Sequence, residues 1–230
     1  MSAPACDRRS LRLAHRGDWR RAPENTLAAL AAAMRVPGCD GVELDVQLSR
    51  VGVPVVLHDE TLARVQGRPD RVDALDAAEL AEAGVPSLAE ALELLGPTAF
   101  LDIELKGAEH GDATADVLRA ARGDHGLRAV VSSHEAPSLA AMADRLPNWT
   151  LWYVAMDLAP TTLSLALGLG CRGLCVLWGA ITPASMREAR DAGLDVAAWT
   201  VRLRSTYRRL ERLGVMAQCV EAGALDGDGR

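Results

Sequence analysis

The amino-acid sequence predicts an α/β protein with a (β/α)8 (TIM) barrel, a closed parallel sheet surrounded by helices. Short β-type runs alternate with alanine-rich helical runs along almost the whole chain, and this alternation indicates a parallel sheet. The 230 residues suit a single barrel domain, since such domains run to roughly 200–250 residues. Polar residues also gather where the apolar runs end, which is where barrel proteins carry their functional groups.

Nine strand-like runs are present, one more than a barrel needs. Strands are expected at Leu11–His15, Gly41–Leu48, Val53–His58, Ala99–Leu105, Ala129–Ser132, Leu151–Ala155, Leu174–Leu177, Val196–Val201 and Ala217–Val220. Helices are expected at Asn25–Met34, Ala74–Ala83, Ser87–Leu95, Ala113–Ala121, Ser138–Arg145, Thr161–Leu167, Ala184–Ala192 and Ser205–Leu213. The second and third strand runs are separated only by Ser49–Gly52, whereas a parallel crossover takes roughly a dozen residues or more. These two runs are therefore expected to form a hairpin in which one of them is the barrel strand.

One domain is expected over residues 1–230, with a small insertion at 59–86 and a tail at 224–230. The insertion is predicted to be a loop and a short helix over the barrel mouth. The net charge of −6 argues against nucleic acid as the partner, although a local basic pocket still allows a small anionic ligand. With no 18-residue apolar run and no apolar signal core, we expect no stable membrane insertion and a cytoplasmic location.

The five cysteines are odd in number and scattered, so no disulfide framework is expected. Cys171 and Cys175 are four residues apart, but no second Cys/His pair with zinc-ligand spacing stands nearby. The spacing therefore favours small buried hydrophobic residues over a metal site.

The single lysine of the chain, Lys106, follows a strand that also carries Asp102 and Glu104. Residues two apart in a strand share a face, so these three side chains are expected to project the same way. Every other basic residue except histidine is arginine, and an ammonium differs chemically from a planar guanidinium. The pattern indicates a site, with a solvated strand face as the alternative.

Further polar residues lie at the ends of the predicted strands. Glu43, Asp45 and Glu104 form an oxygen-rich set that suits a hard divalent cation, Ca²⁺ or Mg²⁺; the alternative is three partly solvated carboxylates without a metal. His15 and His58 each precede a charged residue at a strand end, which suits a general acid and base pair. Arg16 and Lys106 beside a cation would bind a phosphate group.

Together these segments resemble the glycerophosphodiester phosphodiesterase family of the phospholipase C-like barrel superfamily. The resemblance rests on the order and spacing of His15-Arg16-Gly17, Pro23–Thr26, Glu43–Val46, Val55–Asp59 and Ile103–Lys106, and weaker similarity continues to Trp199–Val201. It implies a barrel with an insertion near the mouth, and hydrolysis of a small glycerophosphodiester to an alcohol and glycerol 3-phosphate with Ca²⁺ or Mg²⁺.

Carried over by position, the resemblance makes Glu43, Asp45 and Glu104 metal ligands, His15 and His58 the acid/base pair, and Arg16 and Lys106 phosphate contacts. Trp199 would pack against the glycerol or alcohol group, or serve as an ordinary core tryptophan. The segment Pro23–Thr26 is expected to start a helix. The chain departs from the family pattern at Arg202, where asparagine is usual, and in the last strand with its following residue, Met216–Glu221.

Two other functions are also compatible with the sequence. A lysophospholipase D, or another phospholipid-cleaving phosphodiesterase, would need an apolar rim, whereas residues 59–86 contain several arginines and acids and few large apolar residues. A non-catalytic ligand-binding barrel would require loss of a histidine or metal ligand, and none is lost. The residues do not specify the alcohol group, the preferred cation, which histidine is the acid, or an oligomeric state.

Overall fold

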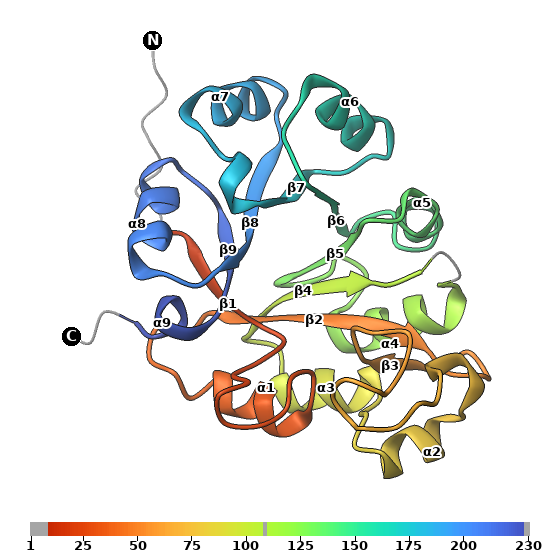
Figure 1. The fold of residues 1–230 in the computed structure, drawn as a ribbon. Coiled ribbons are helices and arrows are strands. Elements are labelled where there is room, and N and C mark those ends of the chain that lie inside the picture. Colours follow the sequence, from red (N-terminus) through yellow and green to blue (C-terminus); the bar gives the residue numbers. More distant parts are fainter. Residues whose placement is uncertain (1–8, 108–109, 228–230) are drawn as a thin grey trace.

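The computed structural model describes residues 9–107 and 110–227, and within these residues eight parallel strands close into a barrel (Figure 1). β1 pairs with β2 on one side and with β9 on the other, which closes the sheet. The strands are β1 (Leu11–His15), β2 (Gly41–Leu48), β3 (Pro54–Val56), β4 (Phe100–Leu105), β5 (Ala129–Ser133), β6 (Thr150–Ala155), β7 (Gly173–Leu177), β8 (Asp195–Val201) and β9 (Ala217–Val220). The predicted (β/α)8 fold is confirmed.

Helices follow the strands and surround the barrel (Figure 1). They are α1 (Leu27–Ala33), α2 (Ala77–Glu82), α3 (Leu88–Leu95), α4 (Asp112–Arg122), α5 (Ala136–Arg145), α6 (Pro160–Gly168), α7 (Pro183–Asp191), α8 (Arg204–Arg212) and α9 (Ala222–Leu225), with short 3-10 helices η1 (Val72–Ala74) and η2 (Trp178–Ala180). Local sequence sets several of their starts. Ser87 and Glu90 form a reciprocal capping box at α3, and Thr26 caps α1. The expected start of α1 at Asn25 is wrong, because Asn25 has a φ of 57°, outside the helical region.

The second and third strand runs form the expected hairpin. β3 pairs with β2 in the antiparallel sense, with Val46 opposite Val56, while β2 pairs with β1 and β4 in parallel. β2 is therefore the barrel strand and β3 an appendage at its carboxyl end. At the other end of β2, a side chain at Gly41 would collide with the Phe100 carbonyl, since a Cβ there would lie 1.8 Å from that oxygen.

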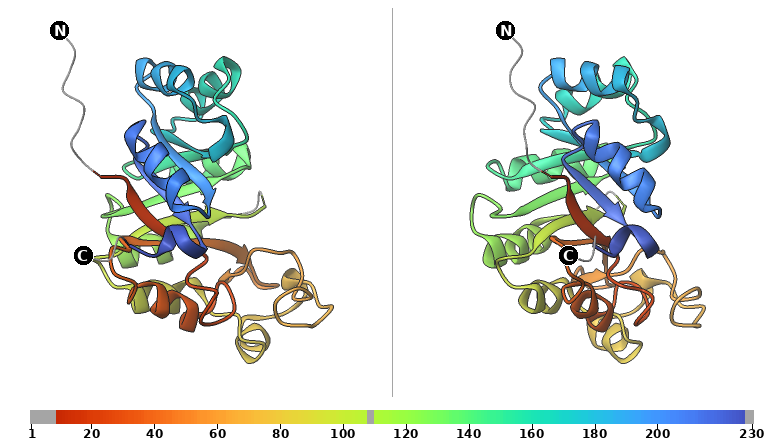
Figure 2. Two further views of the ribbon diagram at one scale, coloured as in Figure 1. Left: turned by 60° about the vertical axis from the view of Figure 1, so that its left-hand side comes forward. Right: turned by 90° about the vertical axis from the view of Figure 1, so that its left-hand side faces the viewer.

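The chain between β3 and α3 builds a small unit beyond the end of β2 (Figure 2). It contains η1 and α2 and packs around an apolar cluster separate from the main core. The cluster consists of Val55, Leu57, Leu62, Val72, Leu75, Leu80 and Val85. Because these side chains bury one another, this insertion has a defined conformation and can place residues at the barrel mouth.

The end of the chain differs from expectation. The tail was expected to begin at residue 224, but Ala224 and Leu225 lie in α9 and are buried in the main core. The Ala224 N–H also donates to the Arg202 carbonyl at 3.0 Å. This apolar pair stabilises the last turn against the barrel. Residues 228–230 of the expected tail, and Cys6, lie outside the described residues.

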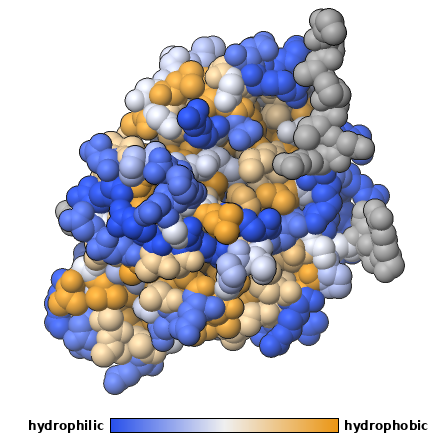
Figure 3. Space-filling view, turned by 180° about the vertical axis from the view of Figure 1, so that it is seen from behind, coloured by the Kyte–Doolittle hydropathy of each residue, from blue (hydrophilic) through white to orange (hydrophobic). Residues whose placement is uncertain are grey.

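Two apolar layers hold the barrel together. The larger lies between the outer faces of the strands and the helices, and a smaller one fills the barrel interior with Leu13, Phe100, Val130, Trp152 and further residues. Seen from behind, the outer surface mixes hydrophilic and hydrophobic residues (Figure 3). No helix in the described part of the chain has the length and apolar character needed to cross a bilayer; the cytoplasmic location stays a prediction.

Candidate active site

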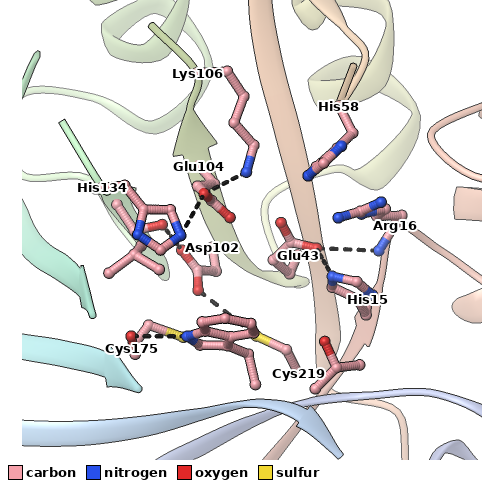
Figure 4. A pocket seen from close by; sticks show the side chains of 14 residues that line it. His15, Arg16, Glu43, His58, Asp102, Glu104, Lys106, His134, Cys175 and Cys219 are labelled. Atoms are coloured by element: carbon pink, nitrogen blue, oxygen red, sulfur yellow. Dashed lines mark hydrogen bonds and ion pairs between the residues drawn. The ribbon is translucent and has the colours of Figure 1, made fainter. Parts of the chain in front are cut away.

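Side chains from the carboxyl ends of the barrel strands surround a cavity of about 110 Å³ (Figure 4). It is lined by His15, Arg16, Glu43, His58, Asp102, Glu104, Lys106, Ser132, His134, Val154, Cys175, Trp199, Thr200 and Cys219. Of the eight residues that the sequence singles out, seven line this cavity. The eighth, Asp45, is completely buried directly beside it.

Three carboxylates from two neighbouring strands converge. Glu43 and Asp45 come from β2 and Glu104 from β4, and one oxygen of each lies within 4.8 Å of the others. The Oε1 atom of Glu43 is buried and has no hydrogen-bond partner among the described residues. Burial, together with the charges of Asp45 and Glu104, raises the pKa of Glu43 well above its usual value. An oxygen-only donor set with an unsatisfied buried oxygen fits a hard divalent cation such as Ca²⁺ or Mg²⁺.

Asp45 is the most firmly held of the three carboxylates. It lies 3.0 Å from Arg16 Nε and 3.0 Å from Lys106 Nζ, and it accepts a hydrogen bond from Asn25 Nδ2 at 2.8 Å. Burial opposes ionisation of Asp45, but the positive charges of Lys106 and Arg16 outweigh it and lower its pKa. The segment Pro23–Thr26 therefore does more than start a helix, because Asn25 orients a candidate ligand.

His15 is held by a carboxylate that the sequence does not reveal. Its Nδ1 lies 2.6 Å from Oε1 of Glu221, which follows β9. Oε2 of Glu221 accepts a hydrogen bond of 2.8 Å from Arg202 Nε. With Nδ1 engaged, Nε2 of His15 faces the cavity, 3.8 Å from Glu43 Oε2. The unusual Arg202 thus pairs with Glu221, and the only sequence signal for Glu221 is its position directly after the last strand.

His58 has a matching partner. Its Nδ1 lies 2.6 Å from Oδ1 of the neighbouring Asp59, and Asp59 accepts a hydrogen bond of 2.6 Å from Arg64 Nε in the insertion. Arg64 also binds Glu24 through two hydrogen bonds, and Glu24 accepts from Arg16 Nη1 at 2.8 Å. This chain of ion pairs links the insertion to both sides of the cavity.

The loop after β1 bends sharply at the site. Arg16 has a φ of 58°, which is uncommon for a residue with a side chain. Its N–H donates to the Glu43 carbonyl and its own carbonyl accepts from Asn25, both at 2.9 Å. Gly17 follows with a φ of 85°, and a Cβ there would lie 2.6 Å from Ala29. The Arg-Gly pair lets the chain turn so that the guanidinium reaches the carboxylates.

The opposite wall carries Lys106, His134 and Trp199. Lys106 forms an ion pair with Glu104 as well as with Asp45. His134, for which the sequence indicates no role, lies 3.8 Å from Glu104 and meets the Trp199 ring edge to face at a centroid distance of 6.0 Å. Trp199 Nε1 donates to the Cys175 carbonyl at 3.1 Å. One edge of the indole is therefore fixed while the residue lines the cavity.

Asp102 lies deeper in the barrel. It is buried, and its Oδ1 accepts a hydrogen bond of 2.6 Å from Ser132 Oγ. Burial raises the pKa of Asp102 to about 7, although the Ser132 hydrogen bond acts in the opposite direction. The sequence places Asp102 on the same strand face as Glu104 but assigns it no ligand role.

The whole arrangement suits chemistry on a phosphate ester. Carboxylate oxygens that suit a cation, two cationic side chains and two histidines, each with its Nδ1 engaged by a carboxylate, face the same small space (Figure 4). Cations stabilise negative charge on phosphate oxygens, and paired histidines transfer protons near neutral pH.

Comparison with known proteins agrees with this geometry. Residues 15–221 match the family model described as the glycerophosphoryl diester phosphodiesterase family. A glycerophosphodiester phosphodiesterase of Caldanaerobacter subterraneus subsp. tengcongensis is 30% identical over 224 residues, covering 90% of this chain and 92% of the relative. An Oleispira antarctica phosphodiesterase, solved in complex with the product sn-glycerol-3-phosphate, has a TM-score of 0.83 at 27% identity, covering 92% of this chain and 93% of that one.

Proposed function

This chain belongs to the glycerophosphoryl diester phosphodiesterase family and is a phosphoric diester hydrolase, and we propose that it cleaves glycerophosphodiesters with a divalent cation and a pair of histidines. One observation carries the proposal: around a single cavity, three carboxylates converge and each of two histidines has its Nδ1 engaged by a carboxylate. The proposed products are an alcohol and glycerol 3-phosphate, supported by the product in the similar Oleispira antarctica phosphodiesterase.

Glu43, Asp45 and Glu104 are the proposed ligands of Ca²⁺ or Mg²⁺. Their oxygen donors suit these hard cations, and the unsatisfied Oε1 of Glu43 supports the assignment. When bound, such a cation would act as a Lewis acid that neutralises charge on a phosphoryl oxygen. The three negatively charged carboxylates repel one another. The ion-pair contacts of Arg16 and Lys106 with Asp45 offset part of this repulsion and hold the ligands together.

His15 and His58 are the proposed acid/base pair. A carboxylate at Nδ1 keeps a proton on that nitrogen, so Nε2 is free to accept a proton from the attacking hydroxyl or to return one to the leaving alkoxide. Glu221 and Asp59 also stabilise the imidazolium that forms in the reaction. Because a carboxylate engages Nδ1 of both histidines, either one can be the acid and the other the base.

Arg16 and Lys106 are the proposed phosphate contacts. Both are cationic and both line the cavity, where burial strengthens their attraction for a negatively charged phosphoryl group. Trp199 is proposed to pack against the glycerol or alcohol part of the substrate. Its ring lines the same cavity, and the hydrogen bond to the Cys175 carbonyl limits its rotation.

The test is release of glycerol 3-phosphate from glycerophosphocholine and glycerophosphoethanolamine, with Ca²⁺, with Mg²⁺ and with a chelator. We expect release that requires a cation and that Glu43→Gln abolishes. The matched control is Glu93→Gln, because Glu93 is exposed on α3, outside the cavity. Equal release in the presence of the chelator would refute the cation requirement.

A second substrate class is favoured by the loops around the mouth. Four exposed large apolar side chains lie after barrel strands, namely Trp19 after β1, Met156 after β6, Trp178 after β7 and Leu203 after β8. Most large apolar residues of 59–86 are buried in the cluster of the insertion, but other loops around the mouth expose large apolar side chains. A lysophospholipid would place its acyl chain against such residues. Lysophosphatidylcholine in the same assay, with release of choline as the readout, distinguishes this lysophospholipase D activity from cleavage of water-soluble diesters.

A further inference from the structure

Below the proposed cation ligands, three other side chains meet inside the barrel. Asp102 of β4, Cys175 of β7 and Cys219 of β9 form what we call the floor cluster, at the base of the cavity (Figure 4). One ligand atom of each lies within 4.8 Å of the others, and each residue is at most 3% exposed. The residues come from three different strands, so the closure of the barrel brings them together.

We propose that the floor cluster binds a thiophilic divalent cation, with Zn²⁺ as the ion it fits best. Two thiolates and a carboxylate form a donor set that Zn²⁺ accepts readily, at about 2.3 Å for sulfur and 2.0–2.2 Å for oxygen. Around a tetrahedral ion these bond lengths place sulfur and oxygen ligands roughly 3.5 Å apart. The Cys219 Sγ and the Asp102 Oδ2 are 3.8 Å apart, so only a small adjustment is needed to bind the ion.

The carboxylate is already oriented for this role. Ser132 Oγ donates to Oδ1 of Asp102 at 2.6 Å, while Oδ2 faces Cys219. Metal-binding carboxylates in proteins commonly have one oxygen held in this way by a neighbouring hydrogen-bond donor. The indole of Trp199 holds the backbone of Cys175 through the bond from Nε1 to the Cys175 carbonyl. Two of the three ligands thus have support from neighbouring residues.

The site would have one open position. All three members of the floor cluster line the cavity, so a cation held by them would face the space in which we propose that substrate binds. Three protein ligands with an open fourth position are typical of zinc sites that exchange water or small ligands. The floor cluster is chemically distinct from the Glu43, Asp45 and Glu104 group above it, because sulfur donors favour Zn²⁺ over Ca²⁺ and Mg²⁺.

The sequence conceals this arrangement. Cys175 and Cys171 have a suggestive spacing, but the Cys171 side chain belongs to the core outside the barrel wall, whereas that of Cys175 belongs to the interior cluster. The alternative is that Cys175 and Cys219 are only small apolar residues filling the interior. A measurement of cation binding to the purified protein distinguishes a Zn²⁺ site from apolar filling without any measurement of phosphodiesterase activity.

The experiment is a titration of the metal-free full-length chain with Co²⁺, which gives an intense near-ultraviolet charge-transfer band only when thiolates bind it. We expect the band in wild type and in Cys171→Ser, and its loss in Cys175→Ser and in Cys219→Ser. One equivalent of Zn²⁺ should remove the band, while excess Ca²⁺ or Mg²⁺ should leave it. Far-ultraviolet circular dichroism confirms that each variant is folded.

A second variant tests the support of Asp102 without removing a ligand. Ser132→Ala is expected to weaken Zn²⁺ binding by about 10–100-fold, measured by competition with a chromophoric chelator. Absence of the charge-transfer band in folded wild type would overturn the proposal, and so would a band that persists in both cysteine variants. Should either cysteine variant fail to fold, the wild-type band and its displacement by Zn²⁺ but not Mg²⁺ decide the matter.

Discussion

Replacing Glu221 with glutamine is expected to slow turnover by about 10–150-fold while leaving KM nearly unchanged. Glu221 engages His15 Nδ1 at 2.6 Å but does not line the cavity. Glutamine has the same shape and keeps a hydrogen-bonding group in place, so the substitution removes the negative charge with little change in packing. We expect Glu221 to act as a positioning residue, through His15.

The magnitude follows from the hydrogen bond. A hydrogen bond to a charged group contributes about 1.5–3 kcal/mol, and each 1.36 kcal/mol in the activation free energy is tenfold in rate. Glu221 would interact most strongly with His15 when the imidazole is charged, as it is in the proposed proton transfer. The loss should therefore fall on kcat. Arg202 lies 2.8 Å from the other oxygen of Glu221, and its own replacement by methionine should have a smaller effect in the same direction.

The assay is steady-state release of glycerol 3-phosphate from the best substrate, with kcat and KM determined separately. Glu93→Gln serves as the control for removing one carboxylate from the chain. Cation binding of the variant should match wild type, since Glu221 is not among the proposed ligands. A Glu221→Gln enzyme with wild-type kcat would refute the reasoning, as would a loss confined to KM.

Three further outcomes are expected. Alanine at His15 or at His58 should lower turnover by about 10²–10⁴-fold with cation binding, measured by calorimetry, retained; wild-type turnover in both variants would contradict the acid/base assignment. The hydrogen bonds from Arg64 and His58 lower the pKa of Asp59 to about 2 from 3.8. The ionised Asp59 carboxylate therefore stabilises the folded protein fully above about pH 4, and this contribution is lost as the pH falls through 2. In acid titrations followed by circular dichroism, the stability advantage of wild type over Asp59→Asn should disappear over that range. A difference in stability that does not change with pH would contradict this role of Asp59. Leu62→Ala, in the buried cluster of the insertion, should reduce the free energy of unfolding, measured with urea, by about 2–5 kcal/mol. A change below about 1 kcal/mol would contradict close packing of Leu62 in this cluster.

Local patterns explain why much of the site could be predicted. The i, i+2 spacing of Glu43 and Asp45 places both carboxylates on one face of a strand, and the same rule brings Glu104 and Lys106 together. Parallel strands then carry these faces to one end of the barrel. His15 and His58 were identifiable because each stands where an apolar run stops.

The partners of these residues were harder to predict, because they lie far away along the chain. Glu221 is 206 positions from His15, and its role depends on β9 pairing with β1 to close the sheet. His134 falls in a segment that resembles a loop, yet the end of β5 brings it to Glu104. Local periodicity contains no information about which strand ends become neighbours in a closed barrel.

The sequence by itself determined the fold class, the hairpin after β2 and most residues of the proposed cation and phosphate site. These follow from short-range rules of periodicity, crossover length and side-chain chemistry. Only the tertiary structure decided which carboxylate holds which histidine, and that Cys175 meets Cys219 and Asp102. The physical reason is that barrel closure sets distances between strands that are remote in sequence, and ion pairs and metal sites depend on those distances.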